Sequence, residues 1–269
     1  MTGRKRRALY FGAVTDREHV RNYWECRPCG TDGDPFPEGS PSYFRWITDS
    51  RYRHEPFIEK YARFTDSNSQ DVLEVGIGVG TDAERFARAG ARFCGIDLTE
   101  RGVQLTGRRF ELAGLSGRFE QADAEALPFP NSSFDFVYSW GVIHHSPDPP
   151  AAAREMVRVC RPGGRVCCMV YNRHSLFALQ GKIFYGLLRG KPGRPIDEIA
   201  AKHFESPGTQ LFNERQLRAM FSGLKEVRVT REVTPYDARI GRRVFVPAPI
   251  RRLIPRHLGY FMVLEGLKA

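Results

Sequence analysis

A glycine-rich turn between a strand and a helix is the feature that most restricts how this chain can fold. Residues 71–75 have strand character, and Thr81 is a good residue to begin a helix. Between them glycine occupies every second position, at Gly76, Gly78 and Gly80. Glycine permits positive φ and lets backbone N–H groups approach a ligand, while the helix N-terminus adds partial positive charge. The turn therefore predicts a βα unit that binds a nucleotide-like molecule.

Strand and helix patterns alternate along the rest of the chain. Strands are predicted over residues 71–75, 92–96, 118–122, 134–140, 165–171, 225–233 and 258–266. Helices are predicted over residues 81–89, 99–114, 149–160 and 213–222, with an amphipathic helix within 176–188. Alternation of this kind is typical of an α/β fold with a doubly wound, largely parallel sheet.

The 269 residues are enough for one large domain with its own core. Residues 1–20 are predicted to be a flexible basic N-terminus, and residues 21–66 an aromatic-rich segment that caps the nucleotide fold. Residues 67–269 form the main domain, with an insertion of lid type over 173–210 after the fifth strand.

The composition is that of an ordinary soluble protein, with 41% hydrophobic and 27% charged residues. No apolar run approaches the roughly 20 residues of a membrane-spanning helix, and no signal-peptide core follows the basic start, so we expect a cytoplasmic protein. The six cysteines follow no disulfide framework. Cys26 and Cys29 have CxxC spacing, but no second CxxC or nearby histidine pair accompanies them, and we expect no metal site.

The net charge of +10 is unevenly distributed. Residues 182–256 contain 16 lysines and arginines against 7 acidic residues. Such a surplus is either a solubilising surface or a basic rim that faces an anionic substrate, a nucleic acid or a membrane surface.

Two kinds of ligand compete for the glycine turn. A nicotinamide dinucleotide site requires G-x-G-x-x-G, whereas the spacing here is G-x-G-x-G. Glu74 precedes the turn, and a carboxylate there is poorly placed against a pyrophosphate. It suits a ligand with a cationic amino-acid end.

Two further acidic residues follow the next two strands. Asp97 ends the second strand, where it can accept hydrogen bonds from both ribose hydroxyls. Asp123 and Ala124 end the third, where a carboxylate can accept from an adenine amino group beside an apolar neighbour. An amino acid, a ribose and an adenine without a phosphate describe S-adenosylmethionine.

Residues 72–172 resemble the class I S-adenosylmethionine-dependent methyltransferases, in the group similar to ubiquinone/menaquinone-type and bacterial small-molecule methyltransferases. The motifs that carry the resemblance are VLEVGIGVG at 72–80, GIDL at 95–98, QADA at 121–124, LPF at 127–129, SFDFV at 133–137, GVIHH at 141–145 and RPGG at 161–164. The resemblance implies a Rossmann-like sheet of seven strands in the order 3-2-1-4-5-7-6, with the last strand antiparallel.

The same resemblance assigns ten residues to the cofactor. From the methionine end through the ribose and adenine to the sulfonium, they are Glu74, Gly76, Gly78, Gly80, Asp97, Leu98, Asp123, Ala124, Trp140 and Gly141.

Methyl transfer from a sulfonium is an in-line displacement, so the protein mainly supplies alignment and desolvation. A general base is needed only when the acceptor must lose a proton. The candidates are His145, His144, Tyr171 and His203. His145 is favoured, His144 could equally be a packed core imidazole, and His203 could be an exposed lid residue.

The aromatic segment and the insertion favour a small-molecule acceptor. This acceptor could be anionic, and the methylation could belong to specialised metabolism. A nucleic-acid (tRNA) methyltransferase is an alternative that rests on the pI of about 9.5, but the chain lacks an (N/D)PP(F/Y) motif after the fourth strand. An NAD oxidoreductase, or a protein that uses the cofactor without methyl transfer, stays open. So does a homodimer through the aromatic segment.

Overall fold

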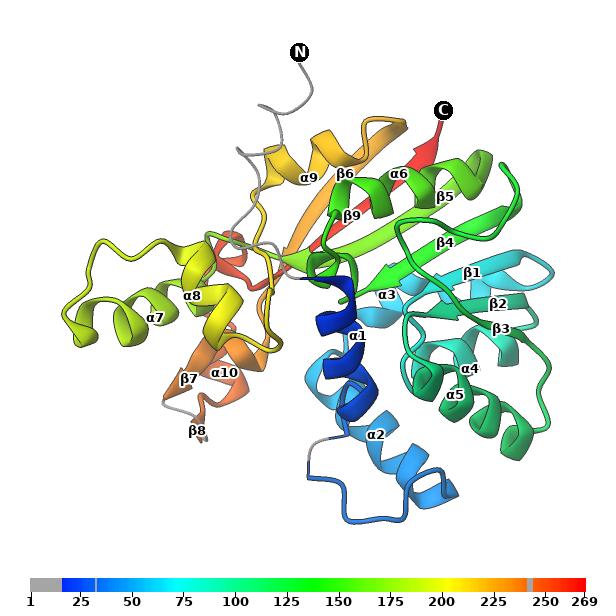
Figure 1. Cartoon of the computed structure of the whole chain (residues 1–269), viewed down its shortest axis with the longest axis horizontal. Coiled ribbons are helices and arrows are strands. Elements are labelled where there is room, and N and C mark those ends of the chain that lie inside the picture. Colours follow the sequence, from blue (N-terminus) through cyan, green and yellow to red (C-terminus); the bar gives the residue numbers. More distant parts are fainter. Residues whose placement is uncertain (1–15, 32, 241–243) are drawn as a thin grey trace.

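A seven-stranded sheet forms the centre of the computed structural model, which describes residues 16–31, 33–240 and 244–269 (Figure 1). The strand order is β3-β2-β1-β4-β5-β9-β6, and β9 runs antiparallel to both of its neighbours. The strands are β1 (Asp71–Val75), β2 (Arg92–Asp97), β3 (Arg118–Gln121), β4 (Phe134–Trp140), β5 (Cys160–Tyr171), β6 (Leu224–Glu232) and β9 (Phe261–Lys268). The predicted Rossmann-like fold, its strand order and its antiparallel last strand are therefore confirmed.

Helices cover both faces of the sheet (Figure 1). On one side lie α4 (Thr81–Arg88) and α5 (Glu100–Ala113), and on the other α6 (Pro149–Val159) and α9 (Glu214–Met220). Alternate residues of β1 serve the two cores: Val72 packs with Phe86 of α4, while Leu73 packs with Met156 of α6. Strands buried on both faces explain why the sequence reads as nearly continuous apolar runs.

The aromatic-rich segment forms α2 (Pro41–His54), α3 (Ile58–Ala62) and the short 3-10 helix η2 (Phe64–Ser67). Ser40 caps α2 by accepting a hydrogen bond from the Tyr43 N–H at 3.2 Å. The buried side chains of Tyr43, Phe44 and Ile47 pack against Val79 of the glycine turn. This segment thus contacts the nucleotide fold directly.

A further helix, α1 (Arg17–Cys26), begins within the stretch 1–20 that we expected to be flexible and ends inside the aromatic-rich segment. Residues 1–15 of that stretch lie outside the described residues. Val20 is the only buried residue of α1, so the helix has almost no apolar stripe to reveal it in the sequence. Polar contacts with distant residues hold it instead.

The insertion and the C-terminal region form a lobe beyond the carboxyl ends of the strands, at the left of Figure 1. Its elements are α7 (Leu176–Tyr185), η4 (Leu187–Arg189), α8 (Ile196–His203), η5 (Pro235–Ala238), β7 (Arg239–Ile240), β8 (Val244–Phe245), α10 (Ala248–Arg251) and η6 (Arg256–Leu258). The sequence predicted α7 but not α8 or the β7–β8 pair. Within the described ranges, no helix has the length and apolar character needed to cross a membrane.

Arg109 of α5 ties the glycine turn to its surroundings. Its guanidinium is buried and donates to the Glu84 carboxylate at 2.6 Å, to the Val79 carbonyl at 3.2 Å and to the Thr81 hydroxyl at 3.2 Å. It also donates to Thr48 of α2. One side chain therefore joins α2, α4, α5 and the turn.

Replacing Arg109 with methionine should destabilise the protein by about 2–4 kcal/mol, because the change leaves a carboxylate and a carbonyl without their buried donor. Urea denaturation of the purified variant would measure this. Arg108→Met is the matched control, since Arg108 lies exposed on the same helix and pairs only with Glu111. Its expected cost is below about 0.5 kcal/mol. Equal midpoints for the two variants would contradict this role of Arg109.

Candidate functional site

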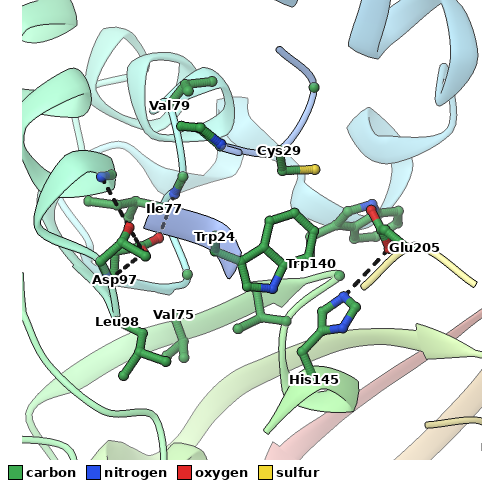
Figure 2. A pocket seen from close by; sticks show the side chains of 18 of the residues that line it. Trp24, Cys29, Val75, Ile77, Val79, Asp97, Leu98, Trp140, His145 and Glu205 are labelled. Atoms are coloured by element: carbon green, nitrogen blue, oxygen red, sulfur yellow. Dashed lines mark hydrogen bonds and ion pairs between the residues drawn. The ribbon is translucent and has the colours of Figure 1, made fainter. Parts of the chain in front are cut away.

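A cavity of about 590 Å³ lies at the carboxyl ends of β1, β2, β4 and β5. Open α/β sheets bind their ligands at this edge, and the volume is that of a small-molecule site. Asp97 lies at one end of the cavity, and His145 and Glu205 lie at the other, with Trp24 and Trp140 between them (Figure 2). The cavity therefore spans the distance from the glycine turn to the inserted lobe.

The structure brings nine of the ten predicted cofactor residues into the wall of this cavity. They are Glu74, Gly76, Gly78, Asp97, Leu98, Asp123, Ala124, Trp140 and Gly141. Gly80 stands apart as the N-cap of α4, with a φ of 74°. Of the four predicted catalytic residues, His145 and Tyr171 line the cavity, whereas His144 and His203 do not.

The glycine turn presents its backbone to the cavity. Gly76 has a φ of 84°, and a Cβ there would lie 2.2 Å from Cγ2 of Val142. Gly78 has a φ of 53°, but a Cβ there would meet nothing within 4 Å. The first position needs glycine for the fold, and the second leaves room for a ligand to approach the chain.

A buried carboxylate supports the turn from behind. Asp82, in the first turn of α4, accepts hydrogen bonds from Arg51 at 2.6 Å, from the Tyr52 hydroxyl at 2.8 Å and from the Tyr138 hydroxyl at 2.9 Å. Burial acts to raise the pKa of Asp82, but the Arg51 charge and these hydrogen bonds hold it below its usual value. Asp82 therefore stays ionised.

Glu74 lies near Asp82 and Arg51, but it forms no ion pair with a described residue. It is only 3% exposed, and its Oε2 has no hydrogen-bond partner among the described residues. Burial, followed by the nearby charge of Asp82, raises the pKa of Glu74 well above the ordinary value. A buried, unpartnered carboxyl oxygen at a cavity wall fits a positively charged ligand group that would pair with it.

Asp97 and Asp123 extend the acidic edge. Asp97 accepts from the Gly78 N–H at 2.8 Å and from the Thr99 N–H and hydroxyl at 2.9 and 2.6 Å. Burial raises the pKa of Asp97, and these hydrogen bonds oppose the rise. Asp123 forms an ion pair with Arg17 at 2.5 Å.

Aromatic side chains form the other end of the cavity. Trp140 donates its indole N–H to Glu55 at 2.7 Å, and this end also holds Met169. Other aromatic residues that line the cavity include Trp24, Tyr171, Phe177, Tyr236, Tyr260 and Phe261. A largely apolar molecule would be well accommodated here.

His145 and Glu205 face each other at this end, with His145 Nε2 3.5 Å from Glu205 Oε2. His145 Nδ1 lies 2.8 Å from the Ser206 hydroxyl, and Tyr171 donates its hydroxyl to Glu205. No sequence motif singles out Glu205, which lies 60 residues after His145 in the inserted region. Only the folded lobe brings the two together.

The other two predicted histidines lie outside the cavity wall. His144 is completely buried and packs on the Tyr171 ring with a centroid distance of 3.9 Å. His203, the last residue of α8, stacks on Tyr185 at 4.1 Å and lies 3.3 Å from Arg194. The side chain of His203 thus contacts residues of the lobe, and neither Tyr185 nor Arg194 lines the cavity.

Helix α1 closes one side of the cavity. The Tyr23 hydroxyl donates to the Glu205 carbonyl at 2.7 Å, and Trp24 packs edge-on against His145 at 5.1 Å. Glu25 accepts from the N–H groups of Glu100 and Arg101, both at 3.0 Å, and so caps α5. A helix with one buried residue is thereby fixed over both ends of the site.

The family model described as "Methyltransferase domain" matches residues 73–168. An uncharacterised protein of Mycobacterium tuberculosis is 32% identical over 166 residues, which are 62% of this chain and 58% of that protein. A fatty-acid O-methyltransferase of Mycolicibacterium smegmatis is 36% identical over 50% of this chain and 48% of its own. A 27-O-demethylrifamycin SV methyltransferase of Amycolatopsis mediterranei is 40% identical over 35% and 36%. The chain therefore spans less than two thirds of these relatives.

Solved structures share the fold at low identity. Magnesium protoporphyrin IX methyltransferase from Synechocystis with bound SAH has a TM-score of 0.62 and 15% identity, covering 94% of this chain and all of that one. The cyclase SpnF has a TM-score of 0.56 and 18% identity, covering 96% and 98%. The fold is thus that of the class I methyltransferases, and S-adenosylmethionine is the cofactor that the matched domain uses.

Replacing Glu25 with alanine should loosen α1, because two N–H groups at the start of α5 lose a charged acceptor worth on the order of 1 kcal/mol. We expect trypsin to cut after Arg21 several-fold faster than in the wild type. Glu18→Ala is the control, since Glu18 is exposed on the same helix. Equal cleavage rates in the two variants would show that the Glu25 contacts do not hold α1.

Proposed function

We propose that this chain, which carries a class I S-adenosylmethionine-dependent methyltransferase domain, transfers the methyl group of that cofactor to a small-molecule acceptor. The observation that carries the proposal is one continuous cavity with two different ends. One end has an open glycine turn and the unpartnered carboxyl oxygen of Glu74. The other end is aromatic, and the two ends meet at Trp140 and Gly141.

In this proposal the acidic end holds the cofactor. Glu74 pairs with its amino group, and the backbone of the turn contacts its methionine part. Asp97 accepts from the ribose, Leu98 and Ala124 flank the adenine, and Asp123 accepts from the adenine amino group. Because Arg17 pairs with Asp123 in the free protein, this contact would have to be shared or released on binding.

The bound cofactor supplies an already activated methyl group on a positively charged sulfur. The chain's own task is therefore to orient the acceptor and to exclude water. Trp140 is fixed for this task by its hydrogen bond to Glu55, and α1 covers the cavity from the outside. Gly141, with a φ of 79°, keeps the exit of β4 free of a side chain.

Among the predicted catalytic residues, we assign His145 and Tyr171 to the acceptor, because both line the aromatic end. His145 is oriented by Ser206, and Tyr171 by its hydrogen bond to Glu205. His144 lies directly behind them, in contact with the Tyr171 ring. We do not include His203, whose contacts are all within the lobe.

The wall of the cavity favours an uncharged, largely apolar acceptor over an anionic one. The arginines that line the cavity, among the described residues, are Arg17, Arg27 and Arg51. Arg17 and Arg51 already form ion pairs with carboxylates of the protein. Of the described residues in the basic stretch 182–256, only Glu205 and Tyr236 line the cavity. Two of the relatives carry names that specify a fatty acid and a rifamycin derivative. The fatty acid supports a largely apolar acceptor, although its carboxyl group is ionised at neutral pH.

Asp97→Ala should lower the affinity for S-adenosylmethionine by about 10- to 100-fold, because it removes an acceptor of charged hydrogen bonds and frees the Gly78 N–H. Titration calorimetry with this cofactor and, separately, with NAD would measure the change. Glu120→Ala is the control, since Glu120 lies on β3 outside the cavity and pairs with Arg118. Unchanged affinity in Asp97→Ala, or binding of NAD alone, would refute the assignment.

Incubation with methyl-labelled cofactor and a fractionated metabolite extract should transfer label into the apolar small-molecule fraction. Bulk tRNA serves as the competing acceptor. Label that appears in tRNA and is lost after nuclease treatment would instead support a nucleic-acid methyltransferase. Cofactor binding without label in either fraction would favour a protein that uses the fold without methyl transfer.

A further inference from the structure

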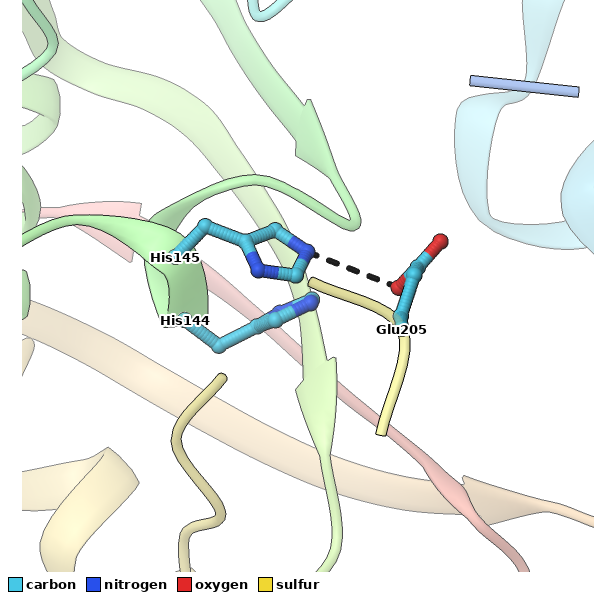
Figure 3. A group of neighbouring side chains, drawn as sticks. All are labelled: His144, His145 and Glu205. Carbon is cyan, nitrogen blue, oxygen red and sulfur yellow. Dashed lines mark ion pairs between the residues drawn. The ribbon is translucent and has the colours of Figure 1, made fainter. Parts of the chain in front are cut away.

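Three side chains that can bind a metal converge beside the aromatic end of the cavity. His144 and His145 belong to the 3-10 helix η3 (Ile143–His145) after β4, and Glu205 follows α8. One ligand atom from each lies within 4.8 Å of the other two. Figure 3 shows the two imidazole rings and the carboxylate gathered around one point.

The contacts of the described residues leave the nitrogen atoms of His144 unexplained. It is completely buried, and neither Nδ1 nor Nε2 has a hydrogen-bond partner among the described residues. A buried polar side chain without a partner is costly, and each such group in a folded protein calls for a specific reason. A metal ion would satisfy one of these nitrogens directly.

The surroundings of the other two residues are those of metal ligands. The Ser206 hydroxyl lies 2.8 Å from Nδ1 of His145 and fixes the orientation of the ring, with Nε2 3.5 Å from Oε2 of Glu205. In the tautomer that carries its proton on Nδ1, the Nε2 lone pair would be available to a metal ion. Tyr171 donates its hydroxyl to the Glu205 carboxylate. Ligating histidines and carboxylates are generally oriented by such outer hydrogen bonds.

We propose that His144, His145 and Glu205 bind one divalent transition-metal ion of the zinc or iron(II) class. Two imidazoles and one carboxylate are the ligand set that such ions prefer, whereas magnesium and calcium favour sites made of oxygen atoms. His145 Nε2 and Glu205 Oε2 are 3.5 Å apart, close to the roughly 3.4 Å that separates two ligands of a tetrahedral zinc ion. A ring nitrogen of His144 lies within 4.8 Å of one ligand atom of each of these two side chains, so His144 is the third ligand of the proposed site.

The ion would leave at least one coordination position open toward the cavity, because His145 and Glu205 both line it. Three protein ligands and one open position are the arrangement of catalytic metal sites. Its role there rests on the proposed function: the open position would bind an oxygen atom of the acceptor and hold it near Trp140. Binding of the ion itself does not depend on methyl transfer.

The experiment uses the tag-free full-length protein and tests metal binding alone. After removal of bound metal with a chelator, Co²⁺ is added as a spectroscopic probe and Zn²⁺ as a competitor. We expect one Co²⁺ per chain, with a visible ligand-field spectrum that Zn²⁺ abolishes. His144→Phe, which keeps an aromatic ring under Tyr171, and Glu205→Gln, which keeps the side-chain size, should each weaken binding on the order of 100-fold or more.

Two control variants separate this site from other metal ligands. His203→Ala removes a histidine of the lobe outside the cavity, and Cys26→Ser with Cys29→Ser removes the CxxC pair. Both should bind Co²⁺ as the wild type does. The proposal is overturned by a wild type that binds no Co²⁺, by normal binding in folded His144→Phe and Glu205→Gln, or by loss of binding in the cysteine variant. The metal titration contains no S-adenosylmethionine, so its results can be interpreted even if the methyl-transfer assay fails.

Discussion

The buried ion pair between Arg51 and Asp82 is the interaction on which the site depends. Asp82 opens the helix behind the glycine turn, Arg51 comes from the aromatic cap, and Tyr138 approaches from the central strand β4. A buried carboxylate is tolerable only when it is paired and fully hydrogen-bonded, so all three elements must be in place together. The cap is therefore an integral part of the cavity wall.

This arrangement has an electrostatic consequence for Glu74. The single guanidinium of Arg51 is already committed to Asp82, and the negative charge of Asp82 adds to burial in raising the pKa of Glu74. A positive charge that arrives from outside the protein would favour the ionised form of Glu74, which burial and Asp82 oppose. A ligand that carries an ammonium group could pair with the buried Glu74 carboxylate. This gives a physical reason for a glutamate before the turn.

The cofactor end could be predicted from sequence because it is built from short-range connections. Glu74 is the last residue but one of β1, Asp97 ends β2 and Asp123 follows β3, and parallel strands bring these ends to one edge. The acceptor end could not be predicted in this way. Glu205 is placed by a loop whose main chain bonds to distant elements, with Gln210 donating to the His144 carbonyl and Phe212 to that of Tyr171. His203, two residues before Glu205, was the more conspicuous candidate, but it ends a helix and faces Tyr185.

The same division explains where similarity to other proteins ends. The matched methyltransferase domain covers residues 73–168, which hold every residue assigned to the cofactor. Glu205, Tyr236 and Tyr260 lie beyond it, and Trp24 lies before it, yet all four line the acceptor end. On the proposed function, a cofactor common to many enzymes constrains the first group, whereas the acceptor constrains the second. The choice of acceptor would then depend on the lobe and on α1, and changes there would alter specificity without disturbing the ion pair that supports the turn.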